Sequence, residues 1–282
     1  MRFSERIGKR QMKVDIQINS MDIELKNSIW NVVYVFLIEP MIKGTLAPKD
    51  KNFIKYIWFS FFREPVDQIP FFNSVGIAKE LRKRFFGWDY LEVYDFIDFL
   101  ASSENLPFSS LRFTQACNNV LERELSAYRF VSGQLAPITN KVEISEIEKA
   151  ISDSIDNNLK GVNIHLTNAL DKLSDKKNPD YRNSIKESIS AVESICQQIT
   201  GESNAELGKT IKKLKDKFPI HSALEQGFIK LYGWTSDGDG IRHAMMEESN
   251  LDQEDALYML VSCSAFINYL ITKTNKFGIE IK

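Results

Sequence analysis

The sequence has few of the residues that build disulfide frameworks and zinc sites. Its 282 residues include three cysteines and three histidines, and no Cys-x-x-Cys pair occurs. Disulfide-rich secreted domains and structural zinc sites need closely spaced pairs of such residues. We therefore predict three buried, reduced thiols, Cys117, Cys196 and Cys263, in a chain long enough to fold without a metal or a disulfide.

A strong charge of one sign and a long apolar run are also missing. The net charge is −2, so nucleic acid would have to bind to a local patch rather than to a general positive field. The most apolar run, residues 29–38, is far shorter than the ~20 residues that cross a bilayer. The chain starts without the apolar core of a secretory signal. These absences predict a cytoplasmic protein without membrane contact.

Signatures of nucleotide-driven and zinc-dependent enzymes do not occur either. There is no Walker A loop, Rossmann glycine pattern, Gly-x-Ser-x-Gly or His-Glu-x-x-His. The Asp-Gly-Asp-Gly run at 237–240 does not fit an EF-hand, because Met246 stands where a bidentate glutamate is needed. We expect no cofactor.

Apolar residues recur at helical spacing through most of the chain, which predicts a mainly α fold. Pro40 should end the first helix, Gly87 should break the third, and Gly201 should stop the helix that reaches residue 199. Asn140 and Asn250 should cap later helices. The predicted helices are 22–38, 50–63, 77–102, 108–126, 157–173, 179–199, 205–217, 221–232 and 251–273.

Two short segments alternate with period two instead. Residues 128–137, around Ser132 and Gly133, predict a small hairpin, and residues 14–19 predict a short strand or an extended arm. We divide the chain into two helical domains, 1–145 and 146–282.

The most distinctive polar segment is a Gly/Asp-rich turn at 233–240 and the residues that follow it. Arg242 can fork onto a phosphate, and His243 can exchange a proton near neutral pH. Together they could hold an RNA phosphate and move protons during attack by a 2′-hydroxyl. In the alternative interpretation Arg242 pairs with Asp237 or Asp239, and His243 packs locally.

Other basic residues could support that turn. Arg182, near the start of a predicted helix, could meet it in space, or could simply be solvated. Lys209, Lys212 and Lys213 form the best local phosphate-binding stripe, although a lysine run is most simply a solvated helix face. The basic segment 2–13 has the same two interpretations.

The other two histidines have simpler interpretations. His165 lies among apolar residues, which predicts a buried, hydrogen-bonded side chain. His221 opens a helix after Pro219, which predicts a surface or capping role.

Several segments of the chain resemble one known family. They are residues 3–10, 25–31, 125–131, 137–139, 178–193, 231–233 and 239–244. These segments resemble the AbiJ-type abortive-infection proteins, in the fourth subtype of their N-terminal domain. The resemblance implies a phage-defence protein whose second half is related to the HEPN (higher eukaryote and prokaryote nucleotide-binding) superfamily.

The HEPN likeness implies a toxin-like, metal-independent ribonuclease that cleaves RNA where two bundles of a homodimer meet. On this chain it points to Arg242 and His243 as catalytic, supported by Arg182, Asp237 and Asp239. The usual signature has four to six residues between the arginine and the histidine, whereas here the two are adjacent and would point about 100° apart on a helix. The alternative is a non-catalytic sensor or adaptor that binds a nucleotide, a nucleic acid or a protein partner in a defence system.

Overall fold

The computed structural model describes residues 3, 9, 16–43, 47–70, 73–104, 106–175, 178–202, 207–237 and 251–281, with the backbone alone for 235–237. The chain divides into two compact units, Met1–Thr139 and Asn140–Lys282. Both are mainly helical, and one two-stranded hairpin is the only sheet in these residues, which confirms the predicted fold class. The expected domain boundary at 145/146 falls inside helix α8 (Lys141–Asp156), which packs against helices of the second unit.

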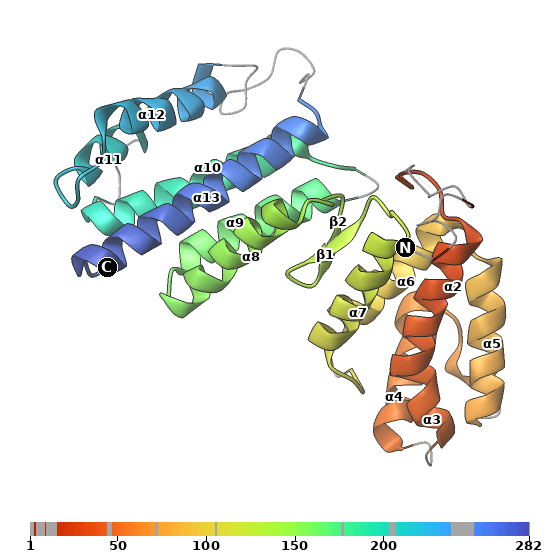
Figure 1. Ribbon diagram of the computed structural model, residues 1–282. Helices are drawn as coiled ribbons and strands as arrows, with labels where there is room; N and C mark the ends of the chain where they lie inside the picture. Colours follow the sequence, from red (N-terminus) through yellow and green to blue (C-terminus); the bar gives the residue numbers. More distant parts are fainter. Residues whose placement is uncertain are drawn as a thin grey trace. The chain divides into compact units, whose positions relative to one another are not determined.

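The first unit consists of short helices followed by the hairpin (Figure 1). Its elements are α2 (Ile23–Val33), the π-helix η1 (Tyr34–Ile38), α3 (Glu39–Lys43), α4 (Pro48–Tyr56), the π-helix η2 (Ile57–Phe62), the 3₁₀ turn η3 (Val66–Gln68), α5 (Ser74–Gly87), α6 (Tyr90–Ser102), α7 (Ser110–Arg123), β1 (Arg129–Val131) and β2 (Gln134–Ala136).

The expectation that Pro40 ends the first helix is wrong. The chain passes from α2 through the wide turn of η1 into α3. The amide of Glu39 bonds the carbonyl of Tyr34, one residue further back than in an α-helix. This local change of register lets the helix continue through a proline that has no N–H to donate.

The predicted break at Gly87 is confirmed. Helix α5 ends there, and Asp89 starts α6 by accepting the amide of Glu92 at 2.9 Å. The Glu92 carboxylate in turn accepts the amide of Asp89 at 2.8 Å. This reciprocal capping box satisfies amides that a new helix would otherwise leave unpaired.

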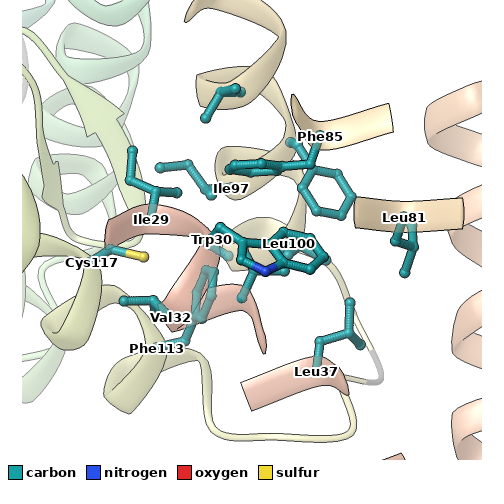
Figure 2. Packing of buried hydrophobic residues seen from close by; sticks show 14 of the residues in the cluster. Ile29, Trp30, Val32, Leu37, Leu81, Phe85, Ile97, Leu100, Phe113 and Cys117 are labelled. Carbon is teal, nitrogen blue, oxygen red and sulfur yellow. The ribbon is translucent and has the colours of Figure 1, made fainter. Parts of the chain in front are cut away.

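The core of the first unit is aromatic (Figure 2). Phe85 is fully buried, and its ring centroid lies 5.2 Å from that of Trp30 and 5.8 Å from that of Trp88. Ile97 and Leu100 of α6 and Phe113 of α7 complete the packing around α2. Large buried rings supply much of the hydrophobic stabilisation that a small unit needs.

The hairpin is held to this core by side chains that bond its backbone. Phe130 pairs with Leu135 in antiparallel register, and Gly133 takes the positive φ of 90° that the turn requires. The amide group of Asn118 bonds both the N–H (2.7 Å) and the carbonyl (2.9 Å) of Phe130. Asp98 accepts the amide of Leu135 at 2.9 Å.

The period-two segment near the start of the chain is an extended arm rather than a strand, within the part that the structure describes. Gln17 makes a single parallel bridge to Ser126, with its amide on the carbonyl of Leu125 at 2.8 Å. Its side chain donates to the carbonyl of Glu124 at 2.6 Å and accepts the amide of Asp22 at 2.6 Å. The arm is therefore tied to the residues that follow α7.

We predict that Tyr94 makes the first unit sensitive to alkaline pH. Its hydroxyl bonds that of Ser126 at 2.7 Å, and burial raises its pKa from 10 to about 12. The contribution of Tyr94 to the free energy of unfolding is fully present below pH 10. It is lost as pH rises towards 12, because the tyrosine ionises first in the unfolded chain, and the free energy of unfolding falls by about 2–3 kcal/mol. Measured by urea unfolding across this range, the free energy of unfolding should fall less with pH for Tyr94→Phe than for the parent. An identical pH dependence of the two proteins would contradict the assignment.

The second unit is built around a bundle of four helices (Figure 1). Helix α10 packs against α9 and α13, α13 also packs against α8, and α11 packs between α10 and α12. The helices are α8, α9 (Lys160–Ser174), α10 (Tyr181–Thr200), α11 (Leu207–Leu214), α12 (Ser222–Asp237) and α13 (Gln253–Phe277).

The caps of these helices correct two expectations and confirm two. Asn140 caps α8 by accepting the amide of Val142 at 2.9 Å, and Gly201 ends α10 in the left-handed region, both as predicted. Asn250 lies outside the described residues, and the cap of α13 is Asp252, which accepts the amide of Asp255 at 3.0 Å. Residues 233–237, which were predicted to belong to a turn, are helical, because α12 continues to Asp237.

Helix α13 is long and apolar enough, by length and composition, to cross a bilayer. The sequence expectation named residues 29–38 as the most apolar run and overlooked this helix, whose polar residues are spread along it. One such helix is weak evidence for a membrane span. Leu260, Phe266 and Ile267 are buried in the unit, as expected for a central core helix.

The three cysteines are free and buried, as predicted. Burial raises the pKa of each thiol, which disfavours the reactive thiolate. We predict that a thiol reagent such as Ellman's reagent labels no cysteine rapidly in the folded protein and all three in denaturant. Rapid labelling of any cysteine under native conditions would contradict this packing.

Candidate functional site

The residues predicted to be catalytic are not among those that the structure describes. Arg242, His243 and Asp239 lie in the segment 238–250, and Asp237 is the last residue of α12, with only its backbone described. The interpretation of their chemistry therefore stays a prediction. The structure does describe both attachment points of this segment and the helices around them.

The segment 238–250 connects the end of α12 to the start of α13, at one end of the second unit. Helix α10 starts at this same end, because it runs in the same direction as α13 (Figure 1). Arg182 is the second residue of α10 and is half-buried. The fold thus places Arg182 at the end of the unit where the predicted catalytic segment is attached.

Helix α12 is fixed to the bundle by aromatic side chains. The ring centroids of Phe228 and Phe266 are 3.6 Å apart, and Tyr232 is 5% exposed. The hydroxyl of Tyr232 lies close to the thiols of Cys263 and Cys196. Burial raises the pKa of Tyr232 well above its usual value. The helix that leads into the predicted site is therefore anchored through an uncharged phenol.

The predicted lysine stripe lies on α11. Leu207, Ile211 and Leu214 face the bundle, and the lysines take the other side of the helix. Lys209 and Lys212 are exposed, whereas Lys213 pairs with Glu202. Next to the helix, Lys215 lies 3.6 Å from the buried carboxylate of Glu225. Part of the stripe is thus neutralised.

The structure separates this stripe from Arg182. Helix α11 packs near the end of α10, and Arg182 stands at its start. The 18 residues from Arg182 to Thr200 correspond to about 27 Å along a helix axis. The candidate residues therefore occupy two ends of the unit, and an extended ligand would be needed to touch both.

One polar pair was missed by the sequence interpretation. His165 on α9 is not buried as expected: its side chain is 36% exposed, and its Nδ1 lies 2.7 Å from the carboxylate of Glu187 on α10. The two residues are 22 positions apart, so no local motif could have indicated the contact. His221 is exposed and accepts the amide of Ala223 at 3.2 Å, which confirms its surface and capping role.

The described part of the chain contains no group of three or more His, Cys, Asp or Glu side chains arranged to hold a metal ion. What it offers is a half-buried guanidinium near the connection from α12 to α13, a histidine oriented by a carboxylate, and a partly neutralised lysine stripe.

These features define a mainly α-helical protein of two units, with the phosphate-binding candidates in the second. The family described as AbiJ N-terminal domain 4 matches residues 1–153, and the chain belongs to this family. Membership indicates a role in abortive infection, a form of phage defence. No curated protein and no solved structure matches the chain. The HEPN-like nature of the second unit stays a prediction.

Proposed function

We propose that the protein is a cytoplasmic abortive-infection effector that cleaves RNA without a metal, as a homodimer in which two second units meet. His243 exchanges the protons, and Arg242 binds the phosphate. Asp237, Asp239 and Arg182 support these two side chains, and the lysines of α11 guide the RNA.

The chemistry follows from those two side chains. The 2′-oxygen forms a bond to phosphorus while the bond from phosphorus to the 5′-oxygen breaks. An imidazole takes the proton from the 2′-hydroxyl, and the leaving 5′-oxygen receives a proton from an acid, which a second imidazole at a dimer interface can supply. The guanidinium stabilises the charge that grows on the phosphate oxygens.

The observation that carries the proposal is the attachment of the segment 238–250. Tyr232 anchors α12 shortly before it, and the Asp252 capping box starts α13 directly after it. Both attachment points lie at the end of the unit where α10 presents Arg182. An anionic substrate bound by a segment attached at this end would meet Arg182 as a further cation, and this supports the proposal.

The decisive experiment is RNA cleavage by the purified His243→Ala protein, with sedimentation to determine the oligomeric state. Loss of cleavage in a dimeric protein supports the proposal. Unchanged cleavage, or a strictly monomeric active protein, would overturn it.

A non-catalytic sensor or adaptor is the second candidate, and the adjacency of Arg242 and His243 favours it. Wild-type protein that cleaves no RNA, yet binds a nucleotide, a nucleic acid or a partner protein tightly, would establish this function instead.

A further inference from the structure

Helix α5 of the first unit exposes a cationic stripe that the sequence interpretation did not single out. The side chains of Lys79, Arg82 and Lys83 are exposed and follow each other at helical spacings of three and four, so they share one face. None of the three forms an ion pair with another residue that the structure describes. We call this set the α5 stripe.

The neighbouring arginine shows what an ordinary structural cation looks like on the same helix. Arg84 bonds Glu64 through both terminal nitrogens, at 2.9 and 3.0 Å, and bonds Glu80 at 2.8 Å. Glu80 is the only carboxylate on α5, so Arg84 already occupies it. The positive charge of the α5 stripe is therefore not balanced by its own helix.

Arg82 differs from a freely solvated side chain. Its guanidinium carbon lies 4.6 Å from the ring centroid of Phe86 and 5.8 Å from that of Trp30. These rings hold the guanidinium near their faces, which reduces the ordering needed when it binds a ligand. A planar, pre-ordered cation between two lysines can contact phosphates and extend a stack of bases.

The charge of the units agrees with this interpretation. Residues 1–139 contain 18 Lys and Arg against 16 Asp and Glu, whereas residues 140–282 contain 18 against 22. The first unit is thus net positive although the whole chain is negative. The acidic side chains on elements packed against α5 are Glu24 of α2, which is exposed, and Glu39 of α3, which is paired with Lys43.

We propose that the α5 stripe is a binding surface for single-stranded RNA. It belongs to a different unit from the predicted cleavage residues, and it rests on the proposed function only in the choice of RNA as ligand. The phosphates bind Lys79 and Lys83, and Arg82 contributes its planar face. The stripe would recruit RNA without regard to sequence, since phosphate contacts carry no base information.

The test is fluorescence anisotropy with a labelled oligouridine of about 20 nucleotides, which exceeds common single-strand site sizes. The full-length protein carries His243→Ala throughout, so that cleavage cannot affect binding. Replacing Lys79 and Lys83 by alanine should weaken binding and lower the slope of log affinity against log salt by about 1–2. Arg82→Lys keeps the charge and should weaken binding with an unchanged slope.

The matched control replaces Lys49 and Lys51, two exposed lysines of α4 in the same unit, by alanine. This protein should bind like the parent. The proposal is overturned if the parent does not bind the RNA, if the α4 control weakens binding as much as the α5 variant, or if the α5 variant binds unchanged. Binding of anionic vesicles or polyglutamate in preference to RNA would also overturn it. Because every protein in this binding test carries His243→Ala, failure of the binding proposal can be distinguished from failure of the cleavage proposal.

Discussion

RNA cleavage should fall by about 10²–10⁴-fold when His243 is replaced by alanine, the range that general acid–base catalysis contributes. The imidazole is the only group in the proposed site that titrates near neutral pH. Cleavage of labelled RNA by purified protein measures the effect directly. Toxicity on induced expression and the integrity of cellular RNA provide the matching readout in cells.

The other two histidines are the controls for this result. His165 pairs with Glu187, and His221 caps the start of α12, so His165→Gln and His221→Gln test the loss of an imidazole elsewhere in the same unit. Both should cleave RNA within a few-fold of the parent. If His165→Gln abolishes cleavage and His243→Ala does not, the proposed general acid–base residue is wrong.

Unfolding of the first unit should require about 3–5 kcal/mol less after Phe85→Ala, the usual loss for a large buried ring. Phe85 is fully buried, and its ring contacts those of Trp30, Phe86 and Trp88. Removing it takes away buried apolar area and leaves a cavity between α5 and α2. Urea titration followed by tryptophan fluorescence reports mainly this unit, because three of the four tryptophans, 30, 58 and 88, belong to it.

Phe59 supplies the matched control. It is also a phenylalanine in a helix of the first unit, but its side chain is 73% exposed. Phe59→Ala should change stability by less than about 0.5 kcal/mol. Equal losses at the two positions would show that the packing around Phe85 is assigned incorrectly.

Local chemistry explains which parts of the fold could be predicted. The break at Gly87, the cap at Asn140 and the end of α10 at Gly201 depend on a few neighbouring residues, so the sequence reveals them. The path through Pro40 could not be predicted, since it depends on a change of hydrogen-bond register over five residues. The extension of α12 past Gly233 depends on Phe228 and Tyr232 packing against another helix.

The candidate sites show the same division. Lys209, Lys212 and Lys213 lie close enough in sequence to predict a lysine stripe. The sequence does not show that Lys213 pairs with Glu202, which lowers the net positive charge of the stripe. The contact of His165 with Glu187 and the stacking of Arg82 near Trp30 join residues from different helices. Such contacts require the packing of the helices to be known.

The attachment of Gln17 has a consequence for how the protein is made. The partner of its side-chain amide is 107 residues later in the chain, and the last of its backbone partners is Ala127. During synthesis, the segment around Gln17 can therefore make these contacts only after residue 127 has left the ribosome, long after Gln17 itself has emerged. Because domains tend to fold as units during synthesis, the helices that follow residue 140 would then emerge behind a unit that is already complete.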